Sequence, residues 1–391
     1  MADIRSLLTE MGARNASDLY LTADSPPILR IEGITEAFGD EVLTAPEVEE
    51  LANSLMTEKQ RANFEEKLEM NLALASGRLG RFRVNVFRQR GAVGVVIRQI
   101  KVQIPTIESL GLPEILKTIT ISRRGLVLVT GATGSGKSTS LAAMIDFRNE
   151  NTCGHIVTIE DPIEFVHPHK RCLLTQREVG FDTLSFNEAL RNTLRQAPDV
   201  ILIGEVRDLE TMEAAITFAE TGHLCLATLH SNNANQAIER VMNFFPENRH
   251  AEIYLQLSLN LRAIISQRLV PGVDGRRVAA LEILIDTPRV KDLIKKGEVD
   301  ILKEAMQQST LEGGQTFDQA LYDLYAAGRI TEEQALANAD SANNLRIRIK
   351  NLDLQNAGRA EAEAGHKPRP GANTDGLRIE GIAPSSTFRR L

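Results

Sequence analysis

Residues 126–144 read LVLVTGATGSGKSTSLAAM, and this stretch decides the fold. It joins an apolar run to a glycine-rich turn and then to an apolar helical segment. The turn fits the P-loop pattern Gly-x4-Gly-Lys-Ser/Thr through Gly131, Ala132, Thr133, Gly134, Ser135, Gly136, Lys137 and Ser138, followed by Thr139. Glycines let the backbone wind tightly, so that N–H groups and a helix N-terminus converge on phosphate oxygens. The stretch therefore predicts a nucleotide site in which Lys137 bridges the β- and γ-phosphates and the Ser138 hydroxyl binds Mg²⁺.

Apolar runs alternate with helical segments on either side of this turn. They occupy residues 126–129, 156–159, 200–203, 224–227 and 278–284. Such alternation predicts an α/β fold with a parallel sheet. Ligands of open parallel sheets bind beyond the carboxyl ends of the strands, so the reactive side chains are expected there.

Carboxylates follow two of these runs. Glu160 and Glu164 come after residues 156–159, and Glu205 comes after residues 200–203. A carboxylate in this place can support the Mg²⁺ shell or polarise water, although it can also cap a helix. Beside a P-loop the catalytic interpretation is favoured, with Glu205 expected at the metal. The residues themselves leave open whether Glu160 or Glu164 activates water.

Histidine and arginine supply the remaining candidates. His230 follows residues 224–229 and is a candidate sensor of the γ-phosphate, whereas His155, His167 and His169 lack a convincing ligand set and are expected in solvated loops. Several arginines could stabilise charge on a phosphoryl group, either within one chain or across a ring of subunits. These are Arg81, Arg83, Arg191, Arg195 and Arg207.

Composition limits the class of protein. The chain has 391 residues, a net charge of −7, 4% aromatic residues and three unevenly spaced cysteines. These values exclude a disulfide scaffold and argue against a protein that grips nucleic acid over its surface. The N-terminus lacks the pattern of a signal peptide, and no apolar run approaches the length of a membrane span. We therefore expect a globular protein of the cytosol.

The pattern along the chain predicts two folded units and a tail. Residues 1–98 read as a mixed α/β unit, with one helix from Ala45 to about Leu68 and a strand at 81–87 that alternates buried and cationic residues. A linker at 99–105 leads to a nucleotide-binding unit at 106–345, which is helical beyond residue 290. Residues 346–391 are rich in Gly, Pro and Ala and lose apolar periodicity, so a disordered tail is expected.

Four motifs together resemble the secretion ATPases of type II secretion and type IV pili. They are the P-loop, the Asp box at residues 158–165, the Walker B segment at 204–208 and the His box at 223–232, in that family's order. The likeness runs from about residue 1 to 345. Because the tetracysteine insertion of the extension branch is missing, the chain resembles the retraction ATPases of the PilT and PilU types. Residues 194–199 and the altered motif at 290–298 favour the PilU type.

The resemblance implies a PAS-like N-terminal domain, a RecA-like P-loop core and a helical C-terminal region. It implies a homohexameric motor that hydrolyses ATP with Mg²⁺ and drives pilus retraction. Glu164 would activate water, with Glu160 the alternative, and His230 would sense the γ-phosphate. The expected partners are an inner-membrane platform protein and a paralogous retraction ATPase, with no nucleic acid and membrane contact only through partners. An accessory ring that docks on the paralogous motor is the alternative role.

Overall fold

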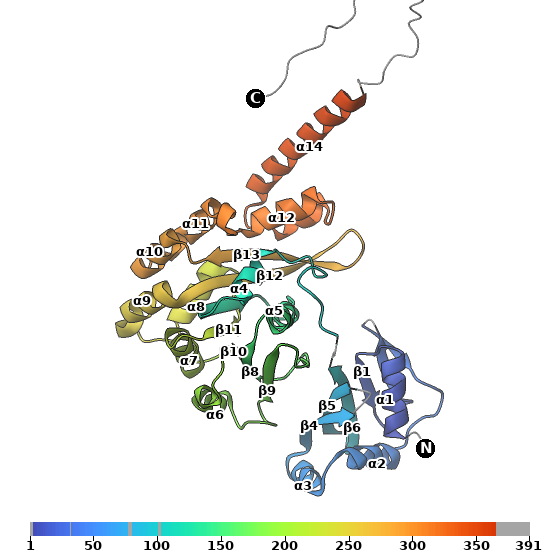
Figure 1. Cartoon of the computed structure of the whole chain (residues 1–391). Helices are drawn as coiled ribbons and strands as arrows, with labels where there is room; N and C mark the ends of the chain where they lie inside the picture. Colours follow the sequence, from blue (N-terminus) through green and yellow to red (C-terminus); the bar gives the residue numbers. More distant parts are fainter. Residues whose placement is uncertain (1–2, 32, 77–79, 101–102, 365–391) are drawn as a thin grey trace, which may run out of the picture.

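The structure is a computed structural model that describes residues 3–31, 33–76, 80–100 and 103–364 (Figure 1). It contains two β-sheets, one formed by residues 18–100 and the other by residues 125–285, each with its own helices. The α/β fold with a small N-terminal unit, predicted above, is confirmed. Among the residues described, no helix combines the length and the apolar character needed to cross a bilayer.

The N-terminal unit is a six-stranded antiparallel sheet in the order β3-β2-β1-β6-β5-β4. Its elements are α1 (Ile4–Ala13), β1 (Asp18–Leu21), β2 (Ile28–Ile31), β3 (Ile34–Ala37), α2 (Ala45–Leu55), α3 (Glu58–Lys67), β4 (Glu69–Ser76), β5 (Gly80–Gln89) and β6 (Ala92–Ile100). Phe82, Val84 and Val86 on β5 are buried in the core of this unit. The intervening Arg81 and Arg83 stay partly exposed, so β5 shows the predicted alternation.

The helix expected from Ala45 to about Leu68 is two helices, so that prediction was wrong. The first ends at Leu55 and the second begins at Glu58. Thr57 caps the second helix: its side chain accepts a hydrogen bond from the Gln60 backbone, and its own N–H donates to the Gln60 side chain. This reciprocal capping box satisfies backbone groups that a continuous helix would use internally, which stabilises the break.

The second unit is a seven-stranded sheet in the order β13-β12-β7-β11-β10-β8-β9. Its strands are β7 (Gly125–Thr130), β8 (Gly154–Glu160), β9 (Cys172–Glu178), β10 (Val200–Ile203), β11 (Leu224–Leu229), β12 (Leu261–Pro271) and β13 (Arg277–Ile285). The five apolar runs form β7, β8, β10, β11 and β13. The sequence did not predict β9 and β12. Because β13 pairs antiparallel with β12, the sheet is mixed rather than purely parallel.

The second unit also contains helices, most of which cover one face or the other of this sheet. They are α4 (Ile115–Thr120), α5 (Lys137–Asn151), α6 (Phe186–Thr193), α7 (Leu209–Glu220), α8 (Ala234–Met242), α9 (His250–Asn260), α10 (Pro288–Lys296), α11 (Leu302–Gln308), α12 (Phe317–Ala326), α13 (Glu332–Asn338) and α14 (Ala342–Ala364), with 3₁₀ turns η1 (Leu194–Gln196), η2 (Glu247–Arg249), η3 (Val299–Ile301) and η4 (Thr310–Glu312). One apolar cluster joins α4 and α5 to the sheet, and a second joins α6–α11 to its other face. The strand ends that carry the predicted motifs are thereby fixed on both sides.

The last helix, α14, projects away from the body of the molecule (Figure 1). Residues 346–364 belong to it, so the expectation of disorder from residue 346 was wrong for that part, while residues 365–391 lie outside the described residues. Leu345 and Ile349 are fully buried against α12 and fix the first turns. Just before the helix, Asp340 pairs with Arg268 and Lys303, each at 2.9 Å.

A candidate nucleotide site at the carboxyl ends of the strands

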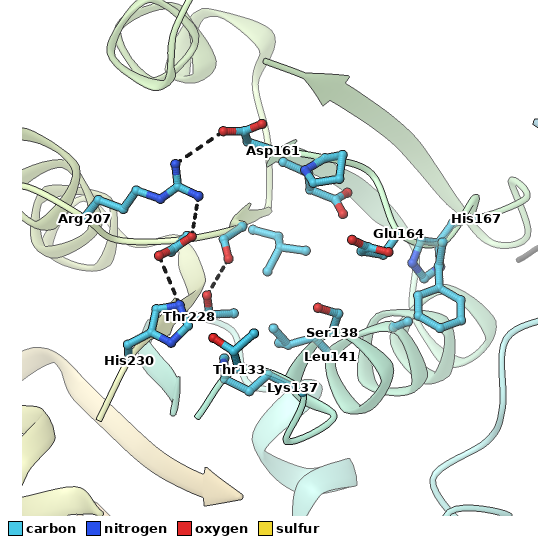
Figure 2. A pocket seen from close by; sticks show the side chains of 18 residues that line it. Thr133, Lys137, Ser138, Leu141, Asp161, Glu164, His167, Arg207, Thr228 and His230 are labelled. Carbon is cyan, nitrogen blue, oxygen red and sulfur yellow. Dashed lines mark hydrogen bonds and ion pairs between the residues drawn. The ribbon is translucent and has the colours of Figure 1, made fainter. Parts of the chain in front are cut away.

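A pocket of about 680 Å³ lies where β7, β8, β10 and β11 end (Figure 2). Its lining includes Thr133, Gly134, Lys137, Ser138, Glu160, Asp161, Glu164, His167, Glu205, Arg207, Thr228 and His230. The motifs predicted from the sequence therefore converge, as the parallel arrangement of these strands requires. Gly131, Ala132 and Ser135 line two neighbouring pockets instead.

The P-loop joins the buried strand β7 to α5, which begins at Lys137. Gly131 has φ +148°, and a Cβ there would lie 2.5 Å from the Ser135 Oγ and 2.6 Å from the Gln267 carbonyl oxygen, so the turn requires glycine. Lys137 Nζ donates to the carbonyls of Gly131 and Ala132 at 2.7 and 3.0 Å. Burial lowers the pKa of Lys137, and the nearby charge of Glu205 opposes that shift.

Glu205, which follows β10, lies between the side chains of Arg207 and His230. Its carboxylate lies 2.6 Å from the Arg207 guanidinium and 3.1 Å from His230 Nε2 (Figure 2). Burial would raise the pKa of Glu205, but the hydrogen bond and charge of Arg207, with His230 and Lys137, leave that pKa lowered. Glu205 is therefore ionised at neutral pH. Arg207 also reaches Asp161 at 3.4 Å, which links the Walker B segment to the Asp box.

The two candidate carboxylates of the Asp box have different surroundings. Glu160 ends β8, half-buried, and accepts hydrogen bonds from Thr158 Oγ1 at 2.7 Å and from Gln176 Nε2 at 3.2 Å; the backbone N–H of Glu164 also lies near enough to lower the pKa of Glu160. Burial raises the pKa of Glu160 despite these bonds. Glu164 is exposed and points into the pocket opposite Lys137 and Ser138 (Figure 2). Glu160 thus holds the loop, and Glu164 is free to meet a ligand.

Of the five predicted arginines, only Arg207 lines the pocket in the described part of the chain. Arg81 and Arg83 instead pair with the buried Glu178, at 3.4 and 3.8 Å. Arg191 on α6 and Arg195 on η1 are exposed. The pocket as formed by one chain therefore contains one of the five cations.

Two pocket residues, His167 and Asp161, and one residue outside the pocket lining, Arg98, had no role of their own predicted from the sequence. His167 was expected in a solvated loop but is 8% exposed, lines the pocket and has a pKa lowered to about 4 by burial, so it is neutral. The expectation holds for His169, which is exposed, but was wrong for His155, which lies on β8 with both ring nitrogens hydrogen-bonded. Asp161 was recognised only as part of the Asp box. Arg98, on β6, lies near enough to Glu164 for its pKa to be raised by that charge, after the larger effect of its hydrogen bond to Asp18.

The polar groups fit a nucleotide with Mg²⁺. In the described part of the chain, no group of three or more His, Cys, Asp or Glu side chains could hold a metal ion alone. Nucleotide-bound Mg²⁺ needs no such cage, because phosphate oxygens and water supply most of its ligands. The exposed Ser138 hydroxyl and the ionised Glu205 are oxygen donors that line this pocket. These are the donors that this cation prefers.

Comparisons with known proteins agree with this geometry. Residues 2–337 match the family model described as type II/IV secretion system protein. The chain is 56% identical over 349 residues to the type IV pilus ATPase PilU of Pseudomonas aeruginosa, covering 89% of this chain and 91% of that one. It is 46% identical over 342 residues to the type IV pilus retractation ATPase PilT of the same organism, covering 88% and 99%.

Solved structures give the same result. The crystal structure of the pilus retraction motor PilT with bound ADP superimposes with a TM-score of 0.83 at 42% identity, covering 88% of this chain and 99% of that one. The Legionella pneumophila ATPase DotB gives a TM-score of 0.74 at 28% identity, with coverage of 85% and 93%. The chain belongs to the type II/IV secretion ATPase family. It is an ATPase with a nucleotide site, and within the family it is similar to the PilU and PilT pilus ATPases.

Proposed function

We propose that this chain is an ATP-hydrolysing motor that powers retraction of type IV pili. The similarity to the PilU and PilT ATPases supports a role in the type IV pilus, and the PilT relative supports a role in retraction. The observation that carries the proposal is one pocket lined by Lys137, Ser138, Glu164 and Glu205. It works as a homohexamer in the cytoplasm, at the inner-membrane base of the pilus machine, where it contacts a platform protein.

Different residues of the pocket have different roles in ATP hydrolysis. Lys137 and the N–H groups of residues 131–139 hold the phosphates, whose oxygens replace the carbonyls of Gly131 and Ala132 as acceptors of Lys137. Ser138 would bind Mg²⁺, with Glu205 in support, and the bound ion would offset charge on the phosphates. Glu164 orients the attacking water, because its carboxylate is exposed in the pocket whereas that of Glu160 is engaged with the loop.

His230 senses the γ-phosphate through its contact with Glu205. Arg207 lies in the same chain's pocket, whereas Arg81, Arg83, Arg191 and Arg195 reach a nucleotide only after a domain movement or from an adjacent subunit. Closure around ATP and opening after hydrolysis would move the N-terminal domain against the core. That movement is the mechanical output of the motor.

A second candidate role is an accessory ring that docks on a paralogous retraction ATPase, with its own hydrolysis secondary. The higher identity to PilU than to PilT favours it. The segment at residues 290–298 differs from the corresponding PilT motif and forms most of α10, at the surface of the core.

Deletion of the chain and a Lys137→Ala variant test both roles. Surface pili are counted and twitching is measured in the two strains, with the exposed Lys67→Ala as a matched control. Excess pili and lost twitching in both strains support the motor. Normal retraction with Lys137→Ala, but not after deletion, supports the accessory ring. Bare cells after deletion contradict retraction altogether, and purified Lys137→Ala that hydrolyses ATP normally contradicts the assigned P-loop.

A further inference from the structure

The Asp-box loop, residues 161–165, is held in place by side chains from two neighbouring strands. Glu160, the last residue of β8, lies near enough to the backbone N–H of Glu164 for that group to lower its pKa. Gln176 on β9 donates to the Phe165 carbonyl at 2.9 Å and accepts the His167 N–H at 2.8 Å. These bonds fix the end of the loop that follows Glu164.

The other side of the loop is held by Glu178, the last residue of β9. Glu178 is the register partner of Glu160 in the parallel β8–β9 ladder. The backbone N–H of Ile163, the residue directly before Glu164, lies near enough to the Glu178 carboxylate to lower its pKa. The Glu178 side chain is 1% exposed, and among the described residues its Oε1 has no hydrogen-bond partner. A buried carboxylate with one oxygen lacking a hydrogen bond needs nearby positive charge to stabilise its ionised form.

That charge comes from the N-terminal domain. Arg81 Nη2 lies 3.4 Å from Glu178 Oε2, and Arg83 Nε lies 3.8 Å from Glu178 Oε1. Both arginines project from one face of β5. Burial raises the pKa of Glu178, and the charges of Arg81 and Arg83 oppose that shift. The N-terminal domain therefore supplies the counter-charge for a carboxylate that belongs to the core.

We propose that Glu178 is a positioning residue that couples the N-terminal domain to Glu164, through its ion pairs with Arg81 and Arg83 on one side and the Ile163 N–H on the other. When β5 is seated on the core, the Glu178 carboxylate is fixed and holds the backbone beside Glu164. When β5 moves away, Glu178 loses its counter-charges, turns toward water and releases that N–H. Placement of the attacking water then follows domain closure. This inference rests on the role proposed for Glu164.

The test is a set of four full-length proteins: wild type, Glu178→Gln, the pair Arg81→Gln with Arg83→Gln, and all three changes together. Glutamine keeps an oxygen for the Ile163 N–H but removes the charge that attracts the arginines. We expect kcat to fall about tenfold in Glu178→Gln, because loss of alignment slows the chemical step. KM for ATP stays near the wild-type value, because the P-loop contacts are untouched. Glu188→Gln, exposed on α6, is the matched control.

The triple variant distinguishes coupling from independent effects of Glu178 and the two arginines. If Glu178 acts through the arginines, the triple variant is no slower than the slower of its two parents. If the arginines act only on a nucleotide and Glu178 only on stability, the effects multiply, and the inference is wrong. Arg81 and Arg83 are partly exposed on β5, so the variant with both arginines replaced should fold. Its kcat therefore tests the proposal even if Glu178→Gln folds poorly. If Glu164→Gln retains full turnover, the proposed role of Glu164 is wrong. If Glu164→Gln is inactive but Glu178→Gln keeps wild-type turnover, only the coupling through Glu178 is wrong.

Discussion

Glu282 gives a prediction whose size follows from its surroundings. This residue of β13 is 1% exposed, and its Oε1 accepts the Ala234 N–H at the start of α8, at 2.7 Å. Ser266 donates to the same oxygen at 3.4 Å. Burial raises the pKa of Glu282 to about 7, with Asp340 adding to the shift and Lys303 and Arg268 opposing it. The folded protein therefore binds a proton here over a pH range in which the unfolded chain has released it.

The direction and size of the effect on stability follow from this difference. Between the unfolded pKa of 4.5 and the folded value of about 7, the folded state holds more protons, so stability falls as pH rises and is level above that range. Glu282→Gln keeps an oxygen for the Ala234 N–H and carries no charge. We expect the stability of Glu282→Gln relative to wild type to increase by about 2 kcal/mol between pH 5 and pH 8.

Thermal melts of both proteins at pH 5, 6, 7 and 8 measure this difference. For a unit the size of the core, the gain in Tm over wild type should grow by roughly 4–8 °C across that range. Glu36→Gln, on the exposed strand β3, serves as the control and should follow wild type. Parallel curves for wild type and Glu282→Gln would show that this carboxyl is not held protonated by burial, and the reasoning would fail.

Three further predictions concern the P-loop and the two cores. Gly131→Ala should fold but lose measurable ATP binding, because the new Cβ overlaps Ser135 and Gln267; calorimetric titration with ATP at wild-type affinity would contradict this. Gln267→Ala should lower stability by about 1–3 kcal/mol and weaken ATP binding, because the buried Ser140 hydroxyl loses its 2.7 Å acceptor; urea unfolding and nucleotide titration measure both. Phe82→Ala should destabilise the N-terminal domain by about 3–5 kcal/mol, since Phe82 is fully buried; unchanged protection of β5 in hydrogen exchange would argue against it.

Local pattern was enough for the centre of the site. A buried strand, a glycine-rich turn and a helix start are consecutive in the chain, so the sequence states the P-loop completely. The break between α2 and α3 could also have been predicted, because Thr57 and Gln60 have the spacing of a capping box. It was missed because the apolar positions continue on both sides. β12 escaped detection because Arg262, Ser266 and Arg268 interrupt its apolar residues and it follows α9 directly.

Pairings between distant segments could not be predicted. Arg81 and Arg83 were recognised as cations on one face of a strand, but their partner Glu178 is 97 residues after Arg81 and carries no local signal. Likewise His167 is buried because the loop folds back on Gln176, a contact that depends on the β8–β9 register. Such contacts are decided by tertiary packing, which single-sequence periodicity does not contain.

The anchoring of α14 has a mechanical consequence. Asp340, just before the helix, pairs with Arg268, and the preceding residue of β12, Gln267, lies against Gly131 of the P-loop and accepts a hydrogen bond from Ser140 on the helix after it. The helix has 23 residues, and at 1.5 Å per residue it is a lever about 34 Å long. A tilt of about 10° at its fulcrum moves the far end by about 6 Å, more than one helical turn. A small displacement of the residues beside the nucleotide is thus amplified at the far end of α14.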